Sequence, residues 1–159
     1  MKLKYTKPQI IFEAIGVIFL IALFVFLGIK YGSLPDRIPT HFNAAGEIDG
    51  WGSKSSIFTI PILGVLIYIL TTGISFFPSS WNFSISKMTP KNEVPLYQCM
   101  KTFLIVTKVE IVTMFCYITL SIVRGVAISA MFVYVIFAVL IVTGLVFFWI
   151  GRNIIKKYV

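Results

Sequence analysis

The sequence has little charge, and this scarcity excludes an ordinary soluble domain. Only 13% of the 159 residues are charged, whereas 58% are hydrophobic, and the mean hydropathy is +0.93. Soluble domains carry roughly 25% charged residues. A chain so poor in charge cannot cover its apolar residues with a polar surface, so we expect a lipid bilayer to be its solvent.

The chain also has only two cysteines and one histidine, which limits its chemistry. Cys99 and Cys116 have no metal-type spacing, and we interpret them as apolar packing residues. The sequence contains no Gly-x-Ser-x-Gly elbow and no His-Glu-x-x-His helix. We therefore predict no metal, no cofactor and no enzymatic activity. The enzymatic alternative is a membrane hydrolase, or a single metal bound by His41 with Glu47 or Asp49.

The sequence does contain four long apolar blocks, at about residues 10–29, 57–77, 103–123 and 127–150. Each is close to the ~20 residues that cross a ~30 Å hydrocarbon layer. The first block follows three lysines, as in a signal peptide, but it is too long and has no small-x-small cleavage site, so we expect a retained anchor. These features predict an all-α membrane protein with four transmembrane helices in a single integral membrane domain, residues 1–159.

The formal net charge of +8 would suggest nucleic-acid binding in a soluble protein. Here the basic residues lie near helix ends, where they indicate topology, so we expect no nucleic-acid partner. With both termini inside, nine basic residues are cytoplasmic and four are outside, while Lys108 lies within a span. The nine are Lys2, Lys4, Lys7, Lys87, Lys91, Lys101, Arg152, Lys156 and Lys157, and the four are Lys30, Arg37, Lys54 and Arg124. This asymmetry predicts an N-in, C-in protein of the plasma (inner) membrane.

Residues 30–56 form the longest polar stretch and, in this orientation, an extracytoplasmic loop. We expect an ordered, membrane-seated loop because its apolar residues are too many for a solvated tether: Leu34, Ile38, Phe42, Ile48 and Trp51. Residues 40–43 are predicted to be extended and turned by residues 44–47 toward Ile48, and Asp49-Gly50 is a second turn signal. We expect His41, Asn43 and Asp49 to bond backbone groups, and Gly46, Gly50 and Gly52 to supply turn geometry.

The third span carries two charges, Lys108 and Glu110, roughly 8 and 10 Å inside its cytoplasmic end. An unpaired Glu110 would cost about 2.5 kcal/mol or more. Residues two apart on a helix face different ways, so we expect Lys108 to snorkel and Glu110 to need another partner. Glu13, near the start of the first span, is expected to pair with an N-terminal lysine.

Polar residues of the third span recur at steps of three and four, which places them on one stripe: Thr107, Glu110, Thr113, Tyr117, Ser121 and Arg124. Neighbouring spans offer partners at similar depth, namely Tyr68, Thr71, Thr72 and Thr143. Two interpretations follow. Glu110 either centres a proton or cation relay or a polar substrate contact, or it is a hydrogen-bonded glutamate that joins helices.

The loop carries a specific motif, Leu34-Pro35-x-x-Ile38-Pro39-x-His41-Phe42-Asn43-x-x-Gly46-x-x-Asp49-Gly50-Trp51-Gly52-x-Lys54. With its flanking helices, over roughly residues 8–75, it resembles the domain of unknown function numbered 1648. That domain also forms the N-terminal part of SdpI-type immunity proteins, bacterial multi-pass proteins that protect a producer from its own secreted toxic peptide. SdpI-type proteins are longer and have further spans, so the resemblance only suggests the immunity role. It implies no catalytic residues.

Two functional hypotheses follow from these features. The first is a non-enzymatic bacterial protein for immunity or cell-envelope protection, whose outer loop meets an antimicrobial peptide or lipid headgroups. The second is a small transport or sensing subunit, working beside another membrane protein, whose function depends on the polar stripe around Glu110.

Overall fold

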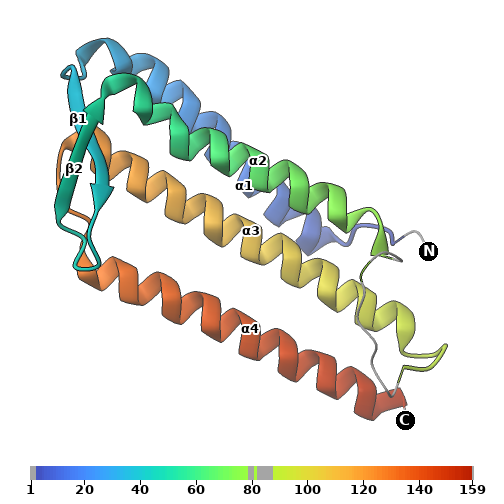
Figure 1. Cartoon of the computed structure of the whole chain (residues 1–159). Helices are drawn as coiled ribbons and strands as arrows, with labels where there is room; N and C mark the ends of the chain where they lie inside the picture. The colour runs from blue at the N-terminus through green and yellow to red at the C-terminus, as the bar shows by residue number, and fades with distance from the viewer. Residues whose placement is uncertain (1–2, 79–80, 82–87, 159) are drawn as a thin grey trace.

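The computed structural model describes residues 3–78, 81 and 88–158, and they are mostly helical (Figure 1). The four long helices are α1 (Lys7–Lys30), α2 (Thr59–Ser75), α3 (Glu93–Arg124) and α4 (Ala130–Tyr158). Each is long and apolar enough to cross a membrane, α2 together with the 3₁₀ turn η2 (Lys54–Phe58) that leads into it. The prediction of a helical membrane protein with four spans is therefore confirmed.

Both termini lie at one end of the molecule and a small β-hairpin lies at the other (Figure 1). We call these the termini end and the hairpin end. The side of the membrane on which each end lies stays a prediction, and Lys2 and Lys87, which count toward it, lie outside the described residues.

Several helix boundaries differ from the predicted spans; α1 begins at Lys7 and α4 at Ala130, each three residues from its predicted start. α3 begins at Glu93, ten residues before the predicted start at 103, and α4 continues to Tyr158 instead of ending at 150. Pro95 does not prevent the early start of α3 because it lies in the first turn, where a missing N–H breaks no helical bond. α2 ends at Ser75, two residues early. Apolar blocks indicate the lipid-soluble part of a helix and not its polar extensions.

Local sequence signals explain where the helices start and stop. The Thr6 hydroxyl accepts a hydrogen bond from the backbone N–H of Gln9, whose side-chain oxygen accepts one from the N–H of Thr6, forming a capping box before α1. α3 ends at Gly125, which has a left-handed φ of 66°. Only five residues separate α3 from α4, so the two helices form an antiparallel hairpin.

The loop between α1 and α2 folds into an antiparallel hairpin, β1 (Arg37–Phe42) and β2 (Ile48–Ser53), preceded by the 3₁₀ turn η1 (Tyr31–Ser33). The chain turns at residues 43–47, as expected, and Gly46 has a φ of 81°. The expectation of a second turn at Asp49-Gly50 is wrong, because both residues lie inside β2. Gly50 and Gly52 serve close contact instead: a Cβ on either would lie 2.8 Å from a side-chain carbon of His41 or Thr40.

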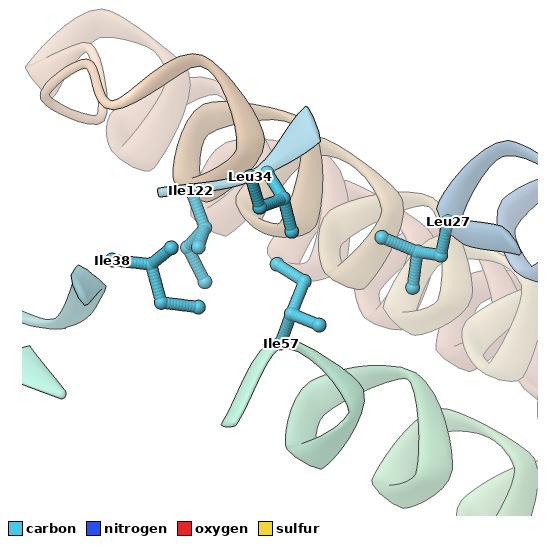
Figure 2. Packing of buried hydrophobic residues seen from close by; sticks show 5 residues of the cluster. All are labelled: Leu27, Leu34, Ile38, Ile57 and Ile122. Carbon is cyan, nitrogen blue, oxygen red and sulfur yellow. The ribbon is translucent and has the colours of Figure 1, made fainter. Parts of the chain in front are cut away.

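A cluster of buried apolar side chains fastens the hairpin to the helix ends. Figure 2 shows its members, which come from α1, the hairpin strand and its lead-in, η2 and α3: Leu27, Leu34, Ile38, Ile57 and Ile122. Ile38 and Ile57 are each 1% exposed. Fully burying such a side chain contributes about 1.5–3 kcal/mol. The hairpin is thus packed against the bundle and is not a free tether.

α4 stands apart from this arrangement. It packs against α3, and none of its residues is buried within the chain (Figure 1). In a bilayer its remaining surface faces lipid or another protein.

Candidate functional site

The outward face of the hairpin presents the motif residues that do not serve its packing. The His41 side chain is 71% exposed and the residue Trp51 is 51% exposed. Asp49 and Trp51 are both exposed residues of β2. His41 Nδ1 lies 2.5 Å from Asp49 Oδ1. The expectation that His41 and Asp49 bond backbone groups is therefore wrong, since they bond each other across the strands.

The turn of the hairpin is held by Asn43, as expected for its side chain. Its Oδ1 accepts hydrogen bonds from the backbone N–H groups of Ala45 (2.9 Å) and Glu47 (3.0 Å), and its Nδ2 donates to Glu47 Oε2 (2.8 Å). Gly46 O in turn accepts from the N–H of Ile128, just before α4, at 2.8 Å. The hairpin turn is therefore fixed both internally and to the α3–α4 connection.

The other motif residues serve the packing or the base of the hairpin. Leu34 and Ile38 lie in the buried cluster, Pro39 is buried and Phe42 packs against the cluster. Pro35 is exposed. At the base, Lys54 Nζ lies 3.2 Å from Asp36 Oδ1 and its backbone N–H donates to Asp36 O. The motif thus divides into a packed inner face and an outer face of His41, Asp49 and Trp51.

A second cluster of polar side chains lies between α1, α2 and α3. Lys108 is 1% exposed, and its Nζ lies 2.8 Å from the Glu13 carboxylate and 2.6 Å from Thr72 Oγ1. The Tyr68 hydroxyl donates to the same carboxylate, and Lys108 Nζ lies 4.1 Å from the centre of the Tyr68 ring. Both charged groups of this cluster, the Lys108 ammonium and the Glu13 carboxylate, therefore have partners, as their burial in a membrane span requires.

This ion pair corrects two expectations. Lys108 does not snorkel to the surface, and Glu13 pairs with it instead of with an N-terminal lysine. Gly16 lets the helices approach, because a Cβ there would lie 2.8 Å from Tyr68 Cε2 and 3.3 Å from Val109 Cγ2.

Glu110 lies on another face of α3, as the two-residue spacing from Lys108 predicted. Its Oε1 accepts a 2.5 Å hydrogen bond from Thr143 Oγ1 of α4, so the expected contact with the fourth span exists. Among the described residues no partner reaches its buried Oε2, nor the buried hydroxyl of Thr107 one turn away. Glu110 therefore joins α3 to α4 and retains one unused acceptor.

Two further members of the predicted stripe, Thr113 and Tyr117, contact groups other than Glu110. The Thr113 hydroxyl donates to the carbonyl of Val109 at 2.8 Å. The Tyr117 ring stacks on Phe132 of α4 with centroids 3.6 Å apart. The three candidate partners in α2 bond to other groups. Tyr68 and Thr72 bind the Glu13–Lys108 pair, and the Thr71 hydroxyl donates to the carbonyl of Ile67.

A polar network near the termini end was not anticipated from the sequence. Gln9 Nε2 donates to Gln98 Oε1 (3.0 Å) and to Thr102 Oγ1 (2.9 Å), although Gln9 is fully buried. Lys101 is 1% exposed, with its Nζ 3.4 Å from the Tyr5 ring centre. Gln9 and Thr102 are uncharged, and each immediately precedes an apolar block, so the sequence gives no sign that their side chains meet.

No group of three or more His, Cys, Asp or Glu side chains within residues 3–78, 81 and 88–158 has the arrangement of a metal site. The His41–Asp49 pair has no third such neighbour in that range. Both cysteines in the described chain are free.

Four membrane-length helices, joined by buried polar clusters and covered at one end by a hairpin, define a multi-pass helical membrane protein. Residues 18–65 match the family model of a domain of unknown function, DUF1648, and the chain therefore contains a DUF1648 domain. The matched segment includes the whole hairpin with parts of α1 and α2, so the resemblance of the loop is confirmed. No curated protein and no solved structure matches the chain.

Proposed function

We propose that this protein is a non-enzymatic membrane protein that protects a bacterial cell envelope against a secreted, membrane-active peptide. The observation that carries the proposal is the outward face of the hairpin, where His41, Asp49 and Trp51 stand exposed on a support packed against three helices. A rigid support lowers the entropic cost of binding, because the contact residues are already in place.

The chemistry of this face suits a cationic, amphipathic peptide. Three of the six acidic residues of the chain lie in the hairpin and its lead-in, namely Asp36, Glu47 and Asp49. Asp36 is paired with Lys54, but Glu47 and Asp49 lie near the tip without a salt bridge to Lys or Arg in the described chain. Trp51 adds an exposed aromatic surface of the kind that anchors binding interfaces.

The test is survival of a sensitive bacterium that expresses the protein, challenged with a panel of secreted peptide toxins and envelope-active antibiotics. We expect protection by the wild type against at least one peptide, and its loss in His41→Ala and Trp51→Ala at matched membrane levels. Arg37→Gln is the control, since Arg37 is exposed on the same strand as His41 but lies at the other end of the hairpin. Full protection by both alanine variants would refute the role of the hairpin face.

A second function, in small-ion transport or sensing, is favoured by the unused Oε2 of Glu110. A buried carboxylate oxygen without a donor is a ready site for a proton or cation. The test is proton or cation flux in proteoliposomes, compared between wild type and Glu110→Gln. Flux lost in Glu110→Gln, with Thr113→Val as an active control, supports this function, and equal flux in wild type and Glu110→Gln removes it.

A further inference from the structure

A polar pocket opens at the hairpin end between the last turns of α1 and α3. It has a cavity volume of about 420 Å³. Its polar lining comes from Lys30, Ser33 and Arg124, and its apolar lining from Phe26, Leu34, Pro35 and Val123. In the described chain neither Lys30 nor Arg124 has a carboxylate within ion-pair distance. Two cations thus line one pocket with no anion to balance them.

An apolar groove continues from this pocket along the seam between α1 and α3. Its volume is about 310 Å³ and its lining is Phe19, Ala22, Leu23, Phe26, Cys116 and Leu120. Phe26 lines both spaces, so the polar pocket and the apolar groove adjoin. The two spaces meet at this side chain, and we call them together the amphipathic channel.

The dimensions of the channel match one lipid leaflet. From Phe19 to Lys30 there are eleven helical steps, about 16 Å at the ~1.5 Å rise of an α-helix. One leaflet contributes half of a ~30 Å hydrocarbon core. A ligand with its charge at Lys30 and Arg124 would therefore place an acyl chain alongside Phe19 at the depth where leaflet chains end.

We propose that this channel binds an anionic phospholipid, with its phosphate between Lys30 and Arg124 and one acyl chain along the α1–α3 groove. Lysine and arginine are the usual phosphate-binding side chains. Both residues also lie at helix C-termini, where positive charge is favourable in itself. That effect accounts for the presence of two cations but not for their shared pocket or for the groove beneath it. The proposal is independent of the function of the hairpin face.

The test is lipid binding to the full-length, delipidated protein, measured by native mass spectrometry during titration with phosphatidylglycerol or phosphatidylcholine of equal chain length. We expect at least tenfold tighter binding of phosphatidylglycerol. Lys30→Gln and Arg124→Gln should each weaken it about fivefold, the value of one basic residue at an anionic lipid surface. Arg37→Gln removes the same charge from the exposed hairpin and should leave binding unchanged.

Two further arms separate the headgroup from the chain. Ala22→Trp places a large ring in the groove at an exposed position, so it should weaken binding of the long-chain lipid while the protein stays folded. Inorganic phosphate should not displace the lipid. Equal binding of the two lipids, an equal loss in Arg37→Gln, or complete displacement by inorganic phosphate would each overturn the proposal, the last in favour of a site for soluble phosphate.

Discussion

Replacing Lys108 by methionine tests whether the buried ion pair holds the bundle together. Methionine keeps the length of the side chain but leaves Glu13 with one partner, the Tyr68 hydroxyl, and Thr72 with none from α3. Removing one member of a buried ion pair costs roughly 3–5 kcal/mol. Because Glu13 is 17% exposed and keeps the hydrogen bond from Tyr68, we expect the lower value, about 3 kcal/mol, for Lys108→Met.

The assay is reversible unfolding of the detergent-solubilised protein in increasing mole fractions of sodium dodecyl sulfate, followed by circular dichroism. Lys91→Met is the matched control. Because Lys91 is exposed, this variant should unfold at the same sodium dodecyl sulfate mole fraction as the wild type. The double variant Glu13→Gln/Lys108→Met should recover at least about 1 kcal/mol of the loss, since it leaves no unpaired charge. Unfolding of Lys108→Met together with the wild type, or strict additivity in the double variant, would refute the reasoning.

Three further predictions use the same unfolding measurement. Gly16→Ala should destabilise the bundle by about 1–3 kcal/mol because its methyl group would overlap a ring on α2, whereas Gly28→Ala, which meets nothing within 4 Å, should not destabilise it. Gly46→Ala should lower the free energy of unfolding by about 2 kcal/mol and make the hairpin accessible to protease. Its Cβ would lie 2.1 Å from a backbone oxygen, and its φ is 81°. An unchanged rate of proteolysis would contradict this. Thr143→Val should cost about 1 kcal/mol by leaving both oxygens of Glu110 without a donor. Unchanged stability of this variant would contradict the reasoning.

Much of the fold could be predicted from the sequence because lipid imposes a strict length on apolar segments. The four blocks place four helices, and the mixture of apolar and turn residues in 30–56 indicates a packed loop. The wrong prediction concerned local structure. Asp49-Gly50 is a turn signal by residue type, but Gly50 lies inside β2, where His41 approaches it closely. A dipeptide pattern carries no information about the strand that packs across from it.

The Glu13–Lys108 pair was missed for a different reason. Sequence position relates each charge to the nearer membrane surface, and a lone lysine in a span is expected to snorkel. The depths of the two charges in the membrane are similar and favour pairing. Measured from the predicted span starts at 10 and 103, Glu13 and Lys108 lie about 4.5 and 7.5 Å deep.

Depth does not say which way a helix face points, and the apolar surface of α1 gives little sign of it. Gly16 does give one, because it lies three residues after Glu13 and therefore on the same face. Small residues in membrane helices occur where neighbouring helices approach closely. A carboxylate beside such a glycine faces protein and not lipid, so its partner has to come from another span at the same depth. Lys108 is the basic residue within a span that meets this condition.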